Sequence, residues 1–568
     1  MEYAAKGRKT MKKKKILAVL LAGIVSSTVL AGCGSSSDGA SEQALNLVGY
    51  DFKSLDPNKV SDSDSFTSLE NIYECLTKEV LKDGKETTEL AGAEKIEKSS
   101  DGLTYTIHLR KDAKWSDGKP VKASEYEYSW KRLTNPSTGA DYMTLLDELN
   151  VKGVSEVMAA AEAKKSGAEV DKLVDQIGVQ AKDDNTLVVT LAKPTPYFEK
   201  ALSFRVLAPV REDKVKEQGD AFGADPAKMV YNGPFTVSEY AKGSKIVYKK
   251  NDTYWDAKNI KLEKATGHII TETTTLVKMF EGGELDITSA AKDDLSRLKE
   301  KAKNGEFQHI SGPDAGAYFN YYNVTRGVLK NAKVRKAMSL ALDRQQFLDV
   351  VYKRCIPSYG LVPDGVNCGS KIYRKEVPQT LKTSVDEAKK LMTEGLKEEG
   401  ITDPSKVSID FLLGEQSSIT KGIGDYIQKT FEETFGIKIK QDFTADAQTY
   451  YKRRTEKDFD MCGGGWTADY NDVSSYFTIF TTGNGNNSGN YSNKEFDSIV
   501  KEASAETDEN KRIELYKKAE DILINQDPAV MPTYYSDVNT FAKNYVKGYQ
   551  IPKFGGSYDL SGVSIQGK

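Results

Sequence analysis

Alternating apolar and polar residues predict short strands in the middle of the chain. From Leu103 to Arg110, the residues at 103, 105, 107 and 109 are apolar and those between them are polar. This period of two is typical of a strand with one buried face. Two shorter segments, 186–191 and 245–250, are further strand candidates. Gly-Pro pairs at 233–234 and 312–313 predict turns between such elements.

The C-terminal half carries the spacing of helices. Isoleucine and phenylalanine recur every four residues over 423–435, which predicts a helix that leads through a glycine into a strand at 437–440. A serine three residues before a glutamate, at 384–387 and again at 492–495, predicts a capping box at the start of two more helices. Strands and helices intermixed over this length predict an α/β protein.

The N-terminus has the pattern of a secretory signal. Met11 is followed by four lysines and then by an apolar run from Ile16 to Leu30. This run of about 15 residues is shorter than the roughly 20 that a spanning helix needs, so a cleaved signal is favoured over a membrane span. We therefore predict a signal peptide over 1–32, with residues 1–10 as an extension upstream of a start at Met11.

Leu30-Ala-Gly-Cys33 resembles the lipobox of bacterial lipoproteins, in which lipid is attached to the cysteine after cleavage. An ordinary signal peptide with an incidental cysteine is the alternative. Acyl chains on Cys33 would hold the protein at the outer face of the bacterial cytoplasmic membrane, on the extracellular or periplasmic side. The Ser/Gly-rich residues that follow predict a flexible tether over 33–43.

Composition narrows the function. With 568 residues the chain is long enough for several domains. The first 32 residues hold seven basic side chains and one acidic one, which leaves 73 basic and 82 acidic groups, a net charge of -9, in the rest. An acidic body does not suit nucleic-acid binding. The three histidines are isolated in the sequence, so neither a His-based catalytic relay nor a metal site is expected.

Besides Cys33, the chain after the predicted cleavage holds four cysteines, Cys75, Cys355, Cys368 and Cys462. A location outside the cytoplasm permits disulfides. Cys355 and Cys368 enclose a short segment with two prolines and two glycines, so they are the pair that we favour. Four cysteines allow three pairings, and the sequence alone does not choose among them.

No motif for covalent chemistry stands out. The chain lacks a Walker A loop, a G-x-S-x-G elbow, an H-E-x-x-H pair and an EF-hand loop. The three glycines at 463–465 lack the spacing of a dinucleotide-binding loop and predict a tight turn or a close backbone approach after a strand. A binding protein without catalytic residues, metal or cofactor is therefore favoured over an enzyme.

Several sequence blocks occur in a characteristic order. They are Leu55–Pro57, Asn71–Leu76, Asp101–Gly118, Tyr128–Arg132, Asn232–Phe235, Tyr254–Asp256, Gly283–Asp286, Val334–Arg344 and Gly465–Asn471. Together they resemble the peptide-binding proteins of oligopeptide ABC transporters, within family 5 of the extracellular solute-binding proteins. The resemblance extends over nearly all of the chain after the predicted signal.

The resemblance implies an α/β fold of the periplasmic-binding-protein type (type II), a two-lobed clamp with an extra domain that closes about a hinge. It places lobe I at 44–77, 212–315 and 537–568, the extra domain at 78–211 and lobe II at 316–536. Such a protein captures oligopeptides between its lobes and delivers them to the permease subunits of the transporter. By the same analogy the chain is a monomer.

The resemblance also implies which residues contact the ligand. Family members bind the peptide main chain as an added strand, and an aspartate, here Asp469, pairs with the α-ammonium group. The segment 62–67 is expected to be the lobe edge that pairs with the main chain. The other expected contacts are Trp466, Tyr470, Asn486, Tyr142, Arg454, Ser65 and Phe66.

Three positions depart from the pattern of some relatives. Gly463 stands where these relatives carry a basic residue that captures the carboxylate of short peptides. Ala447 and Thr420 stand where they carry a tryptophan and a histidine. The capture of a peptide C-terminus and the preferred peptide length therefore stay open.

The alternative functions are a receptor for signalling peptides, a binding protein for a non-peptide solute and, from a different class, an extracellular hydrolase. The hydrolase is disfavoured because the three histidines are isolated.

Overall fold

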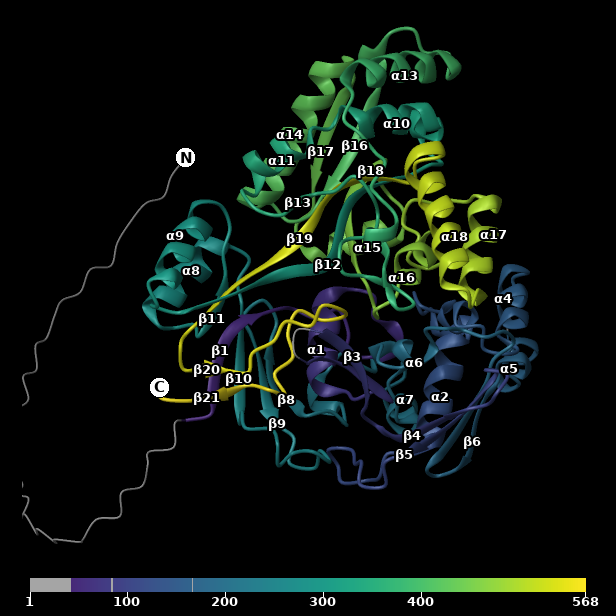
Figure 1. The fold of residues 1–568 in the computed structure, drawn as a ribbon, viewed down its shortest axis with the longest axis vertical. Helices are drawn as coiled ribbons and strands as arrows, with labels where there is room; N and C mark the ends of the chain where they lie inside the picture. Colours follow the sequence, from purple (N-terminus) through teal and green to yellow (C-terminus); the bar gives the residue numbers. More distant parts are fainter. Residues whose placement is uncertain (1–41, 83–84, 166) are drawn as a thin grey trace, which may run out of the picture. The chain divides into compact units, whose positions relative to one another are not determined.

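Three larger β-sheets, three two-stranded ones and the helices that cover them make up the described chain (Figure 1). The structure is a computed structural model that describes residues 42–82, 85–165 and 167–568. The predicted signal peptide and Cys33 lie outside the described residues. Among the residues described, no helix has both the length and the apolar character needed to cross a membrane.

The first sheet joins the start of the described chain to a segment more than 200 residues later. Its strand order is β1 (Ala44–Gly49), β10 (Lys264–Ile269), β9 (Lys245–Lys250) and β8 (Phe235–Ala241), with β1 and β10 parallel. Gly49 and Gly267 are paired in the register, and a Cβ on Gly49 would lie 2.5 Å from the Gly267 carbonyl carbon. The backbones can approach this closely only because both residues are glycine.

The second sheet is antiparallel. Its order is β4 (Ala93–Lys98), β5 (Thr104–Leu109), β7 (Thr186–Thr190) and β6 (Val179–Asp183). The predicted strand at 103–110 is confirmed as β5, in which Tyr105, Ile107 and Leu109 are buried. Helix α2 (Ala123–Thr134) packs against β6 and β7 of the same sheet. The strands predicted at 186–191 and 245–250 are confirmed as β7 and β9. A hairpin, β2 (Thr77–Lys82) and β3 (Lys85–Leu90), precedes this sheet.

The third sheet contains the longest strands. Its order is β11 (Ile287–Ser289), β19 (Val530–Ala542), β12 (Gln308–Tyr322), β18 (Met461–Thr467), β16 (Ser408–Leu413) and β17 (Lys438–Phe443), with β13 (Ile356–Pro357) beside β19. Figure 1 shows β12 and β19 running side by side from β11 toward β18. These two strands pass through positions 315/316 and 536/537, where we expect the lobe boundaries.

The turn predicted at Gly312-Pro313 is wrong, because both residues lie inside β12. The pairing of β12 with β19 is irregular at this point, with a register shift between Pro313 and Ala317. Proline has no N–H to donate to a sheet, so it is tolerated in a strand at such an irregularity. The proline therefore marks a break in the strand pairing without ending the strand. At 233–234, by contrast, the chain bends just before β8 begins.

The helix predicted over 423–435 is confirmed as part of α14 (Ser418–Phe435), which ends at Gly436 with a positive φ of 70° and leads into β17.

The two predicted capping boxes are wrong, although both helices exist. Ser384 precedes α13 (Val385–Glu398), but its side chain makes no cap hydrogen bond. At α17 (Lys494–Ala505) the cap is Asn493, whose carboxamide accepts from the N–H of Glu495 and Phe496. Asparagine is as good an N-cap acceptor as serine, so it replaces the predicted residue.

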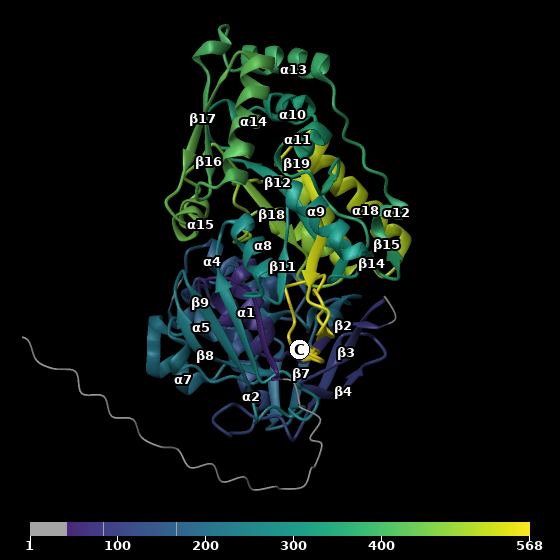
Figure 2. The same cartoon turned by 90° about the vertical axis from the view of Figure 1, so that its left-hand side faces the viewer.

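The remaining helices cover the sheets. Helix α14 packs against β16 and β17, and α10 packs against α13 (Figure 2). The longer ones are α1 (Ser63–Ile72), α4 (Val154–Glu162), α5 (Ala168–Asp175), α7 (Glu212–Gln218), α8 (Thr273–Gly282), α9 (Lys292–Lys303), α10 (Ala332–Ala341), α11 (Arg344–Val351), α15 (Ala447–Thr455) and α18 (Glu509–Asp521). The shorter elements are α3 (Leu145–Glu148), α6 (Phe198–Ala201), α12 (Tyr373–Glu376), α16 (Ser474–Phe477), β14 (Asn367–Cys368), β15 (Lys371–Ile372), β20 (Val546–Lys547) and β21 (Ser564–Ile565).

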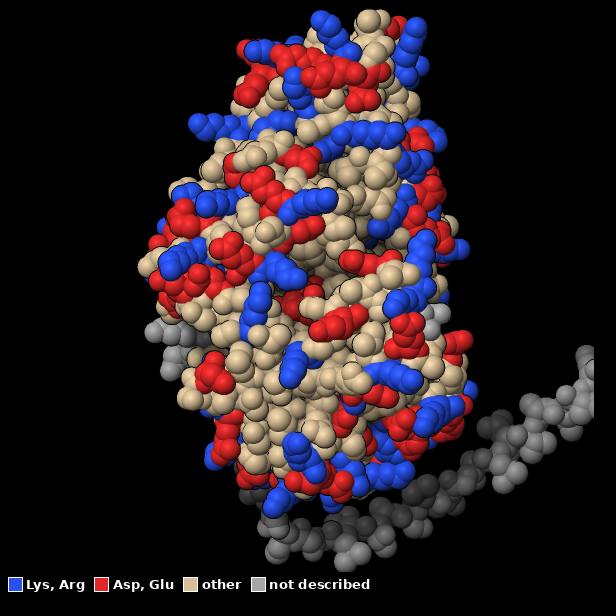
Figure 3. Space-filling model, turned by 90° about the vertical axis from the view of Figure 1, so that its right-hand side faces the viewer, with Lys and Arg blue, Asp and Glu red and all other residues tan. Residues whose placement is uncertain are grey.

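One large apolar core runs beneath the three sheets, and a smaller one lies apart from it. The smaller core joins α8 and α9 to β19, with Phe280, Leu298 and Phe541 fully buried. Figure 3 shows acidic and basic side chains interspersed over the face that it draws. On this face the acidic side chains are therefore mixed with basic ones.

The predicted disulfide between Cys355 and Cys368 is not formed, because all four described cysteines are free thiols. The Cys368 Sγ lies 3.6 Å from the Arg512 Nη1, which donates to it. Cys355 instead precedes β13 and lies beside Asp537 on β19. Each thiol is thus held by its own neighbours, and burial raises the pKa of both to about 12.

Candidate functional site

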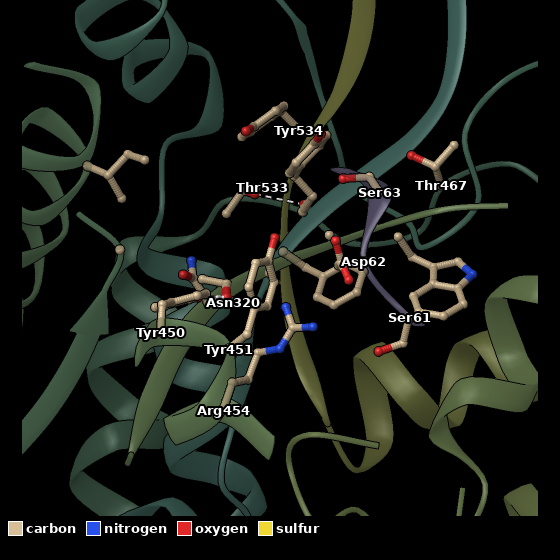
Figure 4. Close-up of a pocket in the computed structure, with 18 of the residues that line it drawn as sticks. Ser61, Asp62, Ser63, Asn320, Tyr450, Tyr451, Arg454, Thr467, Thr533 and Tyr534 are labelled. Carbon is tan, nitrogen blue, oxygen red and sulfur yellow. Dashed lines mark hydrogen bonds between the residues drawn. The ribbon is translucent and has the colours of Figure 1, made fainter. Parts of the chain in front are cut away.

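A cavity of about 340 Å³ is lined by segments that are far apart in the sequence. Its wall is formed by the residues just before α1, by Tyr142, by β12, β16, β18 and β19, and by α11, α14 and α15. Figure 4 shows many of these side chains directed toward the middle of the cavity. Only three of the lining residues carry a charge, namely Asp62, Arg454 and Asp469.

The three glycines at 463–465 keep one side of the cavity open. They lie inside β18, and not in the turn that was one of two expectations for them. A Cβ on Gly464 would lie 2.5 Å from the Tyr321 ring, and one on Gly465 would lie 2.7 Å from the Tyr318 ring. The other expectation, a close approach, therefore describes these positions: aromatic rings lie against bare backbone. At Gly463 the nearest atoms to such a Cβ are 3.7 Å away, so space remains there.

Asp469 follows β18 and lines the cavity, with its carboxylate held by neutral donors. The Tyr142 hydroxyl donates to Oδ1 at 2.8 Å, and the Ser475 hydroxyl donates to Oδ2 at 3.2 Å. Ser475 also accepts from the Asp469 N–H at 3.0 Å and from the Trp466 indole N–H at 3.2 Å. One hydroxyl therefore fixes both the aspartate and the tryptophan beside it.

The environment of Asp469 disfavours its charged form. Burial raises the pKa of its carboxyl well above the usual range, and the nearby Glu148 carboxylate adds to this. The hydrogen bonds from Tyr142 and Ser475 act in the opposite direction. No ion pair involves Asp469 within the described ranges, so its only polar partners there are neutral. Such a carboxylate is poised to accept a cation, which would stabilise its ionised form.

Arg454 supplies the only positive charge on the cavity wall. It projects from α15, with its guanidinium 5.1 Å from the centre of the Tyr451 ring. Burial alone would lower its pKa, but the nearby phenol groups of Tyr321, Tyr450 and Tyr451 outweigh this and raise it. In the part of the chain that the structure describes, the guanidinium forms no ion pair and no hydrogen bond. It is therefore a charged group available to an anion.

Phe66 also lines the cavity, but the segment around it differs from the prediction. Residues 63–67 begin helix α1, so only the residues up to Asp62 have extended backbone. The expectation of a strand-like edge over 62–67 is therefore wrong for most of that segment. Asp62 caps the helix through its side chain, and this cap turns the chain from extended to helical at Ser63.

Three expected contacts lie outside the cavity lining. Ser65 is fully buried, and its hydroxyl accepts from the Lys53 N–H at 2.8 Å. Tyr470 points away from the cavity and stacks on Tyr197, with ring centres 5.7 Å apart. Asn486 is buried in its loop, and its side-chain amide nitrogen has no hydrogen-bond partner among the described residues. The structure thus brings together Asp469, Trp466, Tyr142, Arg454 and Phe66, and not these three.

Sequence reasoning missed an aromatic wall. Tyr318 on β12 and Tyr534 on β19 stack with ring centres 4.7 Å apart, and the Tyr534 hydroxyl lies 3.0 Å from that of Tyr352. Phe347 packs against Tyr352 at the same wall. The 30 tyrosines of the chain were the available signal, but a count does not say which of them face a cavity. The charge of Asp62 on the cavity wall was also missed.

Comparisons with known proteins agree on one family. The family model described as bacterial extracellular solute-binding proteins, family 5 (middle), matches residues 87–488. The oligopeptide-binding protein OppA of Bacillus subtilis is 30% identical over 567 residues, which cover 96% of this chain and 99% of the relative. The dipeptide-binding protein DppE of the same organism is 31% identical over 498 residues, 87% of each chain.

A solved structure gives the same result for the fold. Listeria monocytogenes OppA bound to peptide superposes with a TM-score of 0.81 at 30% identity, covering 93% of this chain and 99% of that one. The solved relatives are two-lobed α/β solute-binding proteins, so the predicted fold class is confirmed. The chain therefore belongs to family 5 of the bacterial extracellular solute-binding proteins.

Proposed function

We propose that this protein captures oligopeptides in the cavity and delivers them to an ABC permease for import. The observation that carries the proposal is the Asp469 carboxylate, which faces the cavity and is held by two neutral donors without a cation. The relatives named above are described as peptide-binding, and one of them is solved with a peptide. A ligand with a free ammonium group supplies the missing positive charge.

The ammonium end of the peptide binds Asp469. Burial of the Asp469 carboxyl lowers the effective dielectric constant around it, so the pair is stronger than an exposed salt bridge, which is worth roughly 0–1 kcal/mol. Tyr142 and Ser475 keep the carboxylate in place while the ligand arrives. Trp466 covers the first residue of the ligand beside this anchor.

Arg454 binds a carboxylate of the ligand. Gly463 leaves β18 without the basic residue that some relatives carry, and Arg454 is the one cation among the cavity-lining residues. Its charge persists at all relevant pH values, because its pKa is raised. Ser65 and Tyr470 support the site from behind, because they lie next to Phe66 and Asp469 in the chain.

Main-chain contacts and side-chain space complete the site. The extended residues before α1 offer backbone groups at the cavity wall, so part of the peptide can bind there as an added strand. Bridging waters in the remaining volume would tolerate different side chains. This arrangement favours binding of a class of peptides over one sequence.

The rest of the proposal follows the family. Its members are extracytoplasmic binding proteins of ABC importers, and we assign this chain the same location and no enzymatic role. Lobe I comprises 44–77, 212–315 and 537–568, the extra domain 78–211 and lobe II 316–536, with the hinge in β12 and β19. Lipid on Cys33 anchors the monomer to the membrane, next to its permease.

Calorimetry tests the function. The protein is unfolded, freed of co-purified ligand and refolded, and then titrated with pools of free peptides of about two to ten residues. Binding with a negative heat-capacity change is expected, because apolar surface of the cavity is buried. Mass spectrometry of the ligand released in the first step should find peptides. Silence across all pools together with a released non-peptide solute would contradict the proposal.

A further inference from the structure

Asp62 has an unusual position for a helix cap. Its Oδ1 accepts from the Ser65 N–H at 2.8 Å, which is the ordinary capping bond of α1. Its Oδ2 is buried and has no hydrogen-bond partner among the described residues. The side chain is only 6% exposed, yet it lines the cavity. A buried carboxylate oxygen without a partner is unfavourable unless something binds it.

The surroundings of Asp62 add negative charge. Asp64, in the first turn of α1, has a pKa raised to about 7, chiefly by burial and then by repulsion from Asp62 and Asp51. The positive charge of Lys53 acts to lower the pKa of Asp62, but the two side chains form no ion pair. Its side chain is exposed and its backbone N–H is bonded to Ser65. The carboxylate therefore has no positive partner on its own side of the cavity.

Arg454 approaches from the opposite side. The Tyr451 phenol is near both charges: burial and then Asp64 and Asp62 raise its pKa, while Arg454 acts in the opposite direction. Figure 4 shows the Asp62 carboxylate and the Arg454 guanidinium both directed toward the middle of the cavity. They do not form an ion pair, so an object that fills the cavity can contact both.

Counting charges on the cavity wall leads to a ligand class. Two carboxylates, on Asp62 and Asp469, face one guanidinium. A peptide with a free ammonium group and one carboxylate pairs with Asp469 and Arg454, which leaves Asp62 without a cation. A buried unpaired charge is costly, so a ligand that carries one more positive group binds better.

We propose that Asp62 is a second cation-binding residue and that the protein prefers peptides with a basic side chain. This inference rests on the proposed function and adds the chemistry of the preferred ligand to it. The ammonium or guanidinium group of a lysine or arginine in the ligand donates to the Asp62 Oδ2, which the protein leaves free. The alternative is that Asp62 serves only to cap α1 or to attract Arg454 when the cavity closes.

Paired peptides test the preference. Tetra-alanine peptides carry lysine at one of the first three positions, and their partners carry norleucine, which has nearly the same shape without the charge. We expect lysine to bind at least about tenfold more tightly than norleucine at one of these positions, as a charged hydrogen bond of this kind provides. Calorimetry on the ligand-free protein measures both affinities.

Two matched variants assign the preference. Asp62→Asn keeps a residue that caps helices well, and it should lower the affinity for the lysine peptide to that for the norleucine peptide. Asp64→Asn removes the neighbouring carboxyl group, which lies two residues later and outside the cavity lining, and should leave the preference in place. A thermal unfolding curve of each variant checks that the fold is kept.

The outcomes separate this inference from the function. If lysine and norleucine peptides bind equally at every position, the preference is wrong while peptide capture stands. If Asp62→Asn weakens both kinds of peptide equally, Asp62 acts on the structure alone and the inference is also wrong. If neither kind of peptide binds, the proposed function fails with it.

Discussion

Asp469 and Asp472 lie three residues apart in one loop and have opposite environments. Asp469 faces the cavity, and burial without a cation raises its pKa. Burial alone would also raise the pKa of Asp472, but the Arg512 guanidinium, at 2.6 and 2.8 Å, outweighs it and lowers the pKa. The first carboxylate is thus left available to a ligand, and the second is used by the fold. Sequence pattern alone does not distinguish the two.

The raised pKa of Asp469 predicts a cost to the empty protein. An aspartate titrates near 3.9 in the unfolded chain, so the folded state binds more protons between that pH and its own raised pKa. Stability therefore falls as pH rises through this window, and the full cost remains above it. Asp469→Asn should stabilise the ligand-free protein at about pH 8 by on the order of 1 kcal/mol, with no gain at about pH 4.

Chemical denaturation of both proteins at the two pH values measures this difference. The ligand must be removed first, because bound peptide stabilises only the protein that retains the aspartate. A variant that is less stable than the parent by the same amount at pH 8 and at pH 4 would contradict this account of Asp469.

At the scale of elements, α18 holds the loop that carries the site. Arg512 on this helix and Asp472 in the loop are each 1% exposed, so their ion pair is shielded from water. The same guanidinium lies 4.8 Å from the centre of the Tyr197 ring, which stacks on Tyr470. Arg512, which lies 40 residues after Asp472 in the chain, therefore fixes the segment from 469 to 472.

Breaking this pair should destabilise the fold strongly. Asp472→Asn leaves a buried guanidinium without its counter-charge, which costs about 3–5 kcal/mol. Because the pKa of Asp472 is lowered, the pair stabilises the protein above about pH 4 and the effect is lost as pH falls through the lower folded value. The loss caused by the substitution should therefore shrink in acid.

Urea denaturation at neutral and acidic pH tests this prediction. Glu514→Gln is the matched control, because its pair with Lys517 at 3.3 Å lies on the exposed surface of the same helix. Exposed pairs of this kind contribute about 0–1 kcal/mol. If the two substitutions cost the same, the pair of Arg512 and Asp472 does not hold the loop.

The elements themselves were largely predictable. Strong periodicity located β5 and α14, because one face of each packs on the core. The capping boxes and the turn at 312–313 were not predictable, since an asparagine competed for one cap and a long-range pairing kept Pro313 inside β12. Local patterns predict local structure, and they fail where a partner from elsewhere in the chain decides.

The site was predictable only in part. The family pattern led to Asp469, Trp466 and Arg454, which the structure brings to one cavity. It also led to Tyr470, which a stacking partner from another segment turns away. The orientation of a side chain depends on its neighbours in space, and sequence order does not specify these.

At the scale of the whole molecule, the cavity depends on long-range assembly. Its lining residues lie between positions 61 and 555 of the chain, and β12 and β19 connect the segments that carry them. The two strands are irregularly paired between Pro313 and Ala317, which is where we place the hinge. Closure about this point would bring the wall with Asp62 toward the wall with Arg454, around the ligand.

The charge of the molecule suits its ligands. The residues after the predicted signal have a net charge of -9. On the face in Figure 3 their acidic side chains are mixed with basic ones. The cavity itself is lined by two carboxylates and one guanidinium. We expect the body of the protein to attract cationic groups weakly from a distance and the cavity to bind them by direct contact. The net charge of the protein and the carboxylates of its cavity therefore both favour cationic ligands.

The most direct test of the account compares a free peptide with its N-acetylated form, on the parent protein and on Asp469→Asn. Acetylation removes the ammonium charge, and the substitution removes the charge that we pair with it. The parent should bind the free peptide at least about 30-fold more tightly, as the loss of one partner of an enclosed charge pair predicts, and the variant should show little difference. Equal weakening of both peptides by Asp469→Asn, or equal binding of both by the parent, would contradict the central claim.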